Sequence, residues 1–303
     1  MKTILATMLF ATSLLAQAAE RYVPEYLNRI SVTVRAEAGY SKSEGSGTLF
    51  VRPVGDRNKT FAWTAGHVLS HLRKVEERIV DGKPQKVITF ENPKLVRELR
   101  NKDGKRTGEI VVDAKVLRYS PADKHDLALL MVLSDDFKAE ASAEFLPKDA
   151  PLTRIGAHVW HCGSLLGSGR NGEGSGHNSI TDGVLSAHGR ILFKVPFCQT
   201  TAPAYPGSSG GIMADSKGRY IGMLVRGAGS DFNLSVPVSR MRDWAKENSV
   251  EWAMDKSLKI TQAQIDKLPI EGPTASGGGK DAGEHKLYPF LIRRTDLKEV
   301  NGK

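Results

Sequence analysis

The sequence predicts an all-β fold of antiparallel strands, and three observations lead to this prediction. From residue 22 to residue 238, short apolar runs alternate with turn residues, and the runs have the lengths of strands. The chain contains 30 glycines and 14 prolines, which is typical of loop-rich β proteins. Few segments have helical periodicity. Strands in series with few helices favour a sandwich or a pair of barrels.

The expected strands follow one another along the chain at residues 30–36, 47–52, 61–66, 109–120, 126–133, 157–163, 183–195, 211–225 and 232–238. Within the eighth of them, ADSKGRY has the composition of a hairpin turn. Two helices are expected near the end, at 239–249 and at 261–268, the second with Thr261 as its N-cap. Residues 271–285, EGPTASGGGKDAGEH, are expected to be a disordered linker.

The first 18 residues have the pattern of a secretory signal peptide. Lys2 precedes the apolar run 4–15, and Ala16 and Ala18 have the spacing of a cleavage site. We therefore expect the mature protein to begin at Ala19 and to be periplasmic or secreted. No later segment is apolar enough to span a bilayer.

Composition and charge indicate a globular protein. The 303 residues are 40% hydrophobic and 25% charged, and the net charge of +9 comes from basic residues interleaved with acidic ones. That mixture is typical of a solvated surface, so we expect no nucleic-acid binding. The two cysteines, Cys162 and Cys198, allow either a disulfide, which export permits, or two buried thiols.

The segment TAPAYPGSSGGIMA, residues 201–214, presses Ser209 between glycines. Gly/Ser runs are usually linkers, but a nucleophilic serine needs a histidine base and an orienting carboxylate. His67 follows a strand in FAWTAGHVLSH, and Asp126 precedes an apolar strand in ADKHDLALLMV. The three residues together predict a catalytic triad.

The segments TAGH, DLALL and PGSSGG resemble the catalytic segments of chymotrypsin-like (trypsin-like) serine peptidases, in particular the bacterial HtrA-type branch. The resemblance covers roughly residues 25 to 245. It implies a peptidase domain at 19–250 with two six-stranded antiparallel barrels, about 25–140 and 150–240, and an active site between them. Residues 251–303 then form a C-terminal tail, too short for the PDZ peptide-binding module of many HtrA-type proteins.

The resemblance also implies the role of each residue in a serine endopeptidase acting on proteins or peptides. Ser209 attacks the carbonyl carbon, His67 is the general base, and Asp126 orients His67. The backbone N–H groups of Gly207 and Ser209 form the oxyanion hole. No metal and no organic cofactor are expected. Natural substrate and oligomeric state stay open.

By the same resemblance, Pro203, Val225 and Leu234 line the primary substrate pocket. Relatives that cut after Arg or Lys have an aspartate where this chain has Pro203, so we expect cleavage after small or aliphatic residues. Asp231 is the alternative source of negative charge in this pocket.

Other motifs have weaker functional interpretations. His67 and His71 have a zinc-ligand spacing but lack the intervening glutamate. In HVWHC, His158 and His161 point to opposite faces of a strand. GSGRNG, residues 167–172, is followed by a strand rather than by the helix that a phosphate site needs. Two other functions remain open: a catalytically silent double-barrel binding protein, and an esterase with the same triad.

Overall fold

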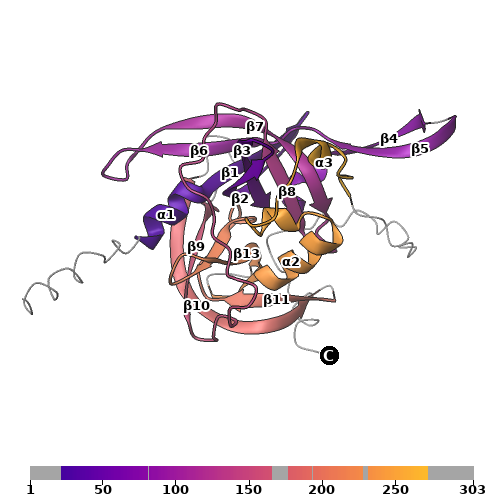
Figure 1. Cartoon of the computed structure of the whole chain (residues 1–303). Coiled ribbons are helices and arrows are strands. Elements are labelled where there is room, and N and C mark those ends of the chain that lie inside the picture. The colour runs from indigo at the N-terminus through magenta and orange to yellow at the C-terminus, as the bar shows by residue number, and fades with distance from the viewer. Residues whose placement is uncertain (1–21, 81, 166–176, 193, 228–230, 272–303) are drawn as a thin grey trace, which may run out of the picture.

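The computed structural model describes residues 22–80, 82–165, 177–192, 194–227 and 231–271. Two closed barrels of six antiparallel strands each make up the body of the molecule. In Figure 1 the first barrel lies above the second. The predicted all-β fold with two six-stranded barrels is confirmed.

The first barrel is closed in the strand order β1-β2-β3-β8-β7-β6. Its strands are β1 (Ser31–Ala38), β2 (Ser41–Val54), β3 (Arg57–Thr64), β6 (Lys94–Arg100), β7 (Arg106–Ser120) and β8 (Leu127–Val132). Every side chain of β8, LALLMV, is buried, which explains why this segment is a continuous apolar run rather than an alternating one.

The second barrel is closed in the order β10-β11-β14-β13-β12-β9. Its strands are β9 (His158–Leu165), β10 (His177–Leu192), β11 (Val195–Thr200), β12 (Ile212–Asp215), β13 (Tyr220–Gly227) and β14 (Asn233–Pro237). The expected hairpin turn joins β12 to β13, with Gly218 at a φ of 79°, a backbone conformation that glycine adopts readily.

Helices and a hairpin lie outside the barrels. They are α1 (Val23–Ile30), the 3-10 segments η1 (Gly66–Leu72) and η2 (Glu251–Ala253), α2 (Val238–Glu247), α3 (Gln262–Asp266), and the two-stranded sheet of β4 (Arg73–Val80) and β5 (Lys83–Phe90). The β4–β5 hairpin projects away from the barrels (Figure 1). Of these elements, the sequence predicted α2 and α3, and Thr261 caps α3 in a capping box with Gln264.

Residues 251–271 pack on the first barrel, although the sequence analysis assigns them to a tail. Trp252 is buried with its ring 4.9 Å from that of Phe61, and Arg52 donates to the Trp252 carbonyl at 2.8 Å. The sequence analysis missed this because Trp252 lies in a short 3-10 turn, which has no periodic pattern.

Strand β2 of the first barrel also contacts the loop before β12 in the second. The N–H of Ser46 donates to the Ser209 carbonyl at 2.7 Å, and its hydroxyl donates to the Gly207 carbonyl at 2.6 Å. The same hydroxyl accepts from the N–H of Ser164 at 2.7 Å. Ser46 therefore fixes the loop that carries Ser209 against the first barrel.

Candidate active site

His67 lies in η1, directly after β3, and is almost fully buried. The residue before it, Gly66, packs so tightly that an added Cβ would lie 2.1 Å from the Ser120 carbonyl oxygen. Only glycine permits that approach. The approach brings His67 beside the loop between β7 and β8.

Asp126 lies in that loop and is fully buried. Its φ of 56° is left-handed, and its N–H donates to the Pro121 carbonyl at 3.0 Å. Oδ1 accepts from the His67 backbone N–H at 2.9 Å, and Nδ1 of His67 is 3.0 Å from each carboxylate oxygen. Because a carboxylate only accepts, Nδ1 carries the proton and Nε2 is the basic nitrogen.

The electrostatics of this pair favour the ionised carboxylate. Burial raises the pKa of Asp126, but the charge and hydrogen bonds of His67 and the charge of Arg226 outweigh burial. Together they lower the pKa from 3.8 to about 2. Asp126 is therefore negatively charged at neutral pH.

Ser209 lies in the turn before β12 and is 3% exposed. Its Oγ donates to the Val225 carbonyl at 3.4 Å. Across the described residues, no hydrogen bond joins this hydroxyl to the His67 ring. The structure therefore brings His67 and Asp126 into direct contact, while Ser209 is paired with the strand β13.

The turn also presents two backbone N–H groups. Gly207 has a φ of 99°, and the carbonyls of Gly207 and Ser209 both accept from Ser46. In the described part of the chain, the N–H groups of Gly207 and Ser209 donate to no protein acceptor. Two such groups near a serine hydroxyl can stabilise a developing oxyanion.

Residues 45–223 match the family model of the trypsin-like peptidase domain. The chain belongs to the trypsin-like peptidase family. This is the class of serine endopeptidases that the sequence analysis predicted, and the matched residues include His67, Asp126 and Ser209.

Two curated relatives are described as probable periplasmic serine endoproteases, DegP-like. The one from Pseudomonas fluorescens is 29% identical and the one from Pseudomonas putida 30% identical, each over 38% of this chain. The matched region spans only 25% and 24% of their lengths. These names agree with the predicted resemblance to the HtrA-type branch.

Solved structures of an HtrA-type protease, AlgW, have the same fold. AlgW with a tripeptide is 20% identical, with a TM-score of 0.51 over 76% of this chain and 62% of that one. A serine-to-alanine variant of AlgW, also with a tripeptide, is 18% identical, with the same TM-score and the same coverage. At these identities the likeness concerns the fold alone.

Sequence analysis of this trypsin-like peptidase missed Arg226, a buried residue of β13. Its Nη2 donates to Asp126 Oδ2 at 3.3 Å and to the Ala122 carbonyl at 2.7 Å. The sequence signal for Arg226 was that it is a single cation in the otherwise apolar strand YIGMLVRG. A cation at the end of a strand is equally typical of an exposed residue.

The residues expected to line the primary pocket differ in burial. Val225 and Leu234 are fully buried within the main core, whereas Pro203 is partly exposed. Ala204 and Leu224 form a separate apolar pair. Asp231, the alternative source of pocket charge, is exposed.

Buried polar contacts lie in the same region of the second barrel. Asn233 is fully buried, and its Nδ2 donates to the Ala202 carbonyl at 2.9 Å. The Thr181 hydroxyl donates to the Pro203 carbonyl at 2.7 Å. These hydrogen bonds fix the backbone of residues 202–203 against β10 and β14. No motif in the sequence marks Asn233.

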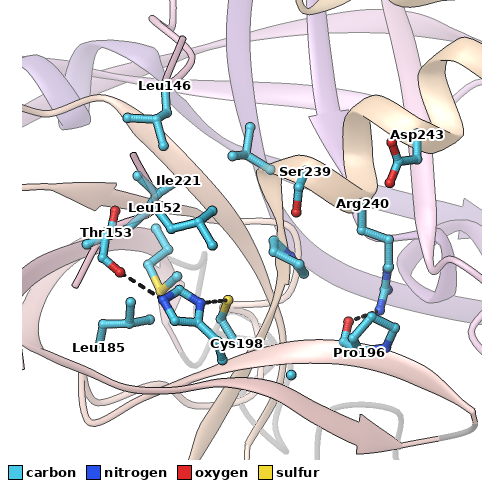
Figure 2. A pocket seen from close by; sticks show the side chains of 15 residues that line it. Leu146, Leu152, Thr153, Leu185, Pro196, Cys198, Ile221, Ser239, Arg240 and Asp243 are labelled. Carbon is cyan, nitrogen blue, oxygen red and sulfur yellow. Dashed lines mark hydrogen bonds between the residues drawn. The ribbon is translucent and has the colours of Figure 1, made fainter. Parts of the chain in front are cut away.

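The two cysteines are free and buried, so the structure contains the two thiols rather than the disulfide. Burial raises the pKa of Cys162 to about 12 and that of Cys198 to about 11. Cys198 borders a cavity of about 230 Å³, where its sulfur is 3.3 Å from Nδ1 of His188. Figure 2 shows this cavity, which contains none of the triad residues.

The other histidines make separate contacts. Nε2 of His71 is 2.9 Å from the Ala36 carbonyl. His158 is exposed and paired with Asp182, whereas His161 is fully buried, so the two do point to opposite faces of β9. Within the described residues, no three His, Cys, Asp or Glu side chains are grouped as metal ligands.

Three segments named in the sequence analysis lie outside the described residues: 1–18, 167–172 and all but the first residue of 271–285. In the part of the chain that is described, no helix has the length and apolar character to cross a membrane.

Proposed function

We propose that this protein is an exported serine endopeptidase that cleaves peptide bonds through Ser209, His67 and Asp126. One observation carries the proposal: a fully buried, ionised Asp126 lies 3.0 Å from Nδ1 of His67 and leaves Nε2 as the base. The Ser209 turn is attached to the same barrel through Ser46.

In the proposed mechanism, the Ser209 hydroxyl first turns from the Val225 carbonyl toward Nε2 of His67. Catalytic hydrogen bonds of this kind often form only in the substrate complex. Oγ then attacks the peptide carbonyl carbon as Nε2 takes its proton, and Asp126 stabilises the imidazolium. The N–H groups of Gly207 and Ser209 bind the oxyanion. His67 returns the proton to the leaving amine, and water hydrolyses the acyl-enzyme by the same route.

The proposed specificity is for small or aliphatic residues before the cleaved bond. Three observations support it. Pro203 lies where relatives that cut after Arg or Lys have an aspartate, and Asp231 is exposed. The neighbouring Ala204 and Leu224 are apolar. A buried cationic side chain without a counter-charge is unfavourable by several kcal/mol. In a peptide-library digest read by mass spectrometry, we expect cuts after Ala, Val, Ile or Leu; cuts mainly after Arg or Lys would contradict this specificity.

Export is proposed from the pattern of residues 1–18 and from the curated relatives, which are named periplasmic. The proposed partners are protein or peptide substrates. N-terminal sequencing of the protein recovered from the periplasm or the medium tests this part, and we expect it to begin at Ala19.

The triad is tested by substitution. Ser209→Ala and His67→Ala should each lower peptide turnover by about 10⁴-fold or more, and the double variant should lose little more, because the residues act as a unit. Labelling by a fluorophosphonate, located by peptide mass spectrometry, should fall on Ser209 alone.

Two matched variants are the controls. Ser208→Ala removes the neighbouring hydroxyl, and His71→Ala removes the neighbouring imidazole; both should leave the label on Ser209. A folded protein without labelling or turnover would instead be a binding protein. Turnover of short esters without cleavage of casein would indicate an esterase.

A further inference from the structure

Arg226 places a second cation on the carboxylate that orients the proposed base. Its side chain is 7% exposed and that of Asp126 is fully buried, with 3.3 Å between Nη2 and Oδ2. Oδ2 is also 3.0 Å from Nδ1 of His67. One buried carboxylate oxygen therefore has both a guanidinium and an imidazole as neighbours.

The backbone of β13 directs Arg226 to this place. Leu224 is opposite Ser235 in β14, but Arg226 is opposite Leu234, so Val225 is the extra residue of a β-bulge. A bulge changes the direction of the side chains that follow it. The carbonyl of the bulged Val225 accepts from Ser209. Arg226 thereby connects the strand beside the nucleophile to the carboxylate on the other barrel.

Among the described residues, the groups in direct contact are then the imidazole of His67, the carboxylate of Asp126 and the guanidinium of Arg226. Around them lie other charged or titratable groups: His71 of η1, the Arg73–Glu271 ion pair, Tyr119 of β7, Asp123 and His125 of the β7–β8 loop, and Arg240 of α2. Arg240 donates to the carbonyls of Pro196 and His125 rather than to Asp126. Arg226 is thus the guanidinium in direct contact with the carboxylate.

We propose that Arg226 is a positioning residue that fixes the Asp126 carboxylate and offsets part of the negative charge that His67 faces. The carboxylate has its pKa held near 2, so it stays ionised while the imidazole titrates. Without Arg226, the full negative charge faces the imidazolium and stabilises it. The proposal builds on the proposed function, but its central measurement does not require activity.

The experiment follows the His67 ring by NMR in the Ser209→Ala protein, with the signal assigned by its loss in His67→Gln. Arg226→Met should move the titration midpoint of this signal upward by about one to two pH units. Arg226→Gln, which keeps a donor for the Ala122 carbonyl, should give a similar shift and replaces the Met variant if that one does not fold. Arg226→Lys keeps the charge and should shift the midpoint less than half as far.

Arg219→Met is the matched control, because Arg219 forms an ion pair with Asp215 instead; it should leave the midpoint in place. In protein with Ser209 intact, the acidic limb of the pH profile of kcat/KM should move by the same number of pH units as the NMR midpoint. An unchanged or lowered midpoint in folded Arg226→Met would overturn the proposal. Equal shifts for Arg226→Lys and Arg226→Met would also overturn it. Absence of peptidase activity with an upward midpoint shift would instead contradict the proposed function alone.

Discussion

Gly210 lies at a point where the Ser209 turn meets two segments of the first barrel. Its φ is 90°, and an added Cβ would be 2.1 Å from the Ser46 carbonyl oxygen and 2.6 Å from Oγ1 of Thr64. Neither neighbour is free to move, since the Thr64 hydroxyl donates to that same carbonyl at 2.7 Å. A side chain at position 210 would therefore displace the nucleophile from the first barrel.

Gly210→Ala should lower the free energy of unfolding by about 3 kcal/mol and abolish fluorophosphonate labelling of Ser209. Chemical denaturation and mass spectrometry measure the two effects. Gly108→Ala is the control, because an added Cβ there would meet only Leu99, at 3.8 Å, and both readings should stay at wild-type values. Wild-type labelling in Gly210→Ala would contradict this account of the turn.

At the scale of elements, the C-terminal segment from η2 to α3 acts as part of the first barrel. Trp252 packs edge-on against Phe61, and Trp244 of α2 packs in the same way against Trp63 at 5.8 Å. The parallel bridge between Val54 and Ile260 continues this attachment. The segment covers apolar side chains that water would otherwise reach.

Trp252→Ala should therefore lower the free energy of unfolding by about 3–5 kcal/mol, the usual effect of emptying a buried aromatic site. Thermal and chemical denaturation measure it. Leu258→Ala, at a 41% exposed position in the same segment, should change the stability far less. Equal stability of Trp252→Ala and the wild type would mean that this segment is dispensable.

The elements differ in how well the sequence predicts them. The alternation of apolar runs and turns predicts a sandwich or a pair of barrels, and the resemblance to trypsin-like peptidases narrows this to two six-stranded barrels. The segments around His67, Asp126 and Ser209 predict the triad candidates. Helix α1 has only eight residues and runs directly into β1; its apolar residues at 23, 26, 27 and 30 have helical spacing, but a pattern of two turns is too short to be distinctive. Strand β4 of the β4–β5 hairpin is mostly charged, and a charged run predicts exposure rather than pairing.

Contacts between distant segments were beyond sequence reasoning for a different reason. Ser46 and Arg226 form hydrogen bonds with residues that are far from them along the chain. The direction of Arg226 depends on a one-residue bulge, which no local composition in YIGMLVRG signals. Such contacts follow from register and barrel closure, and these are properties of the folded chain.

At the scale of the whole molecule, the buried His161 makes stability depend on pH. Burial lowers its pKa from 6.5 to about 4, although a hydrogen bond to the Ile212 carbonyl at 3.0 Å acts in the opposite direction. Between pH 6.5 and about pH 4, His161 binds a proton in the unfolded chain but not in the folded chain. Lowering the pH through this window therefore favours unfolding.

The free energy of unfolding should fall by about 3 kcal/mol through this group as the pH drops from 6.5 to 4. His161→Asn, whose amide can still donate to the Ile212 carbonyl, should lose that part of the pH dependence in urea titrations. His158→Asn, on the exposed face of the same strand, should retain it. Identical pH profiles for the wild type and His161→Asn would contradict this role.

The Ser46 hydroxyl also constrains how this chain can change over evolutionary time. A substitution that removes it takes a donor from the Gly207 carbonyl and an acceptor from the N–H of Ser164 in β9 at once, while the backbone bond from Ser46 to the Ser209 carbonyl stays. Both lost partners are backbone groups, so no side-chain change at position 207 or 164 restores the two bonds. Because strand β2 carries a hydroxyl that fits this backbone of the second barrel, the two barrels are expected to be inherited as a pair rather than exchanged between homologues.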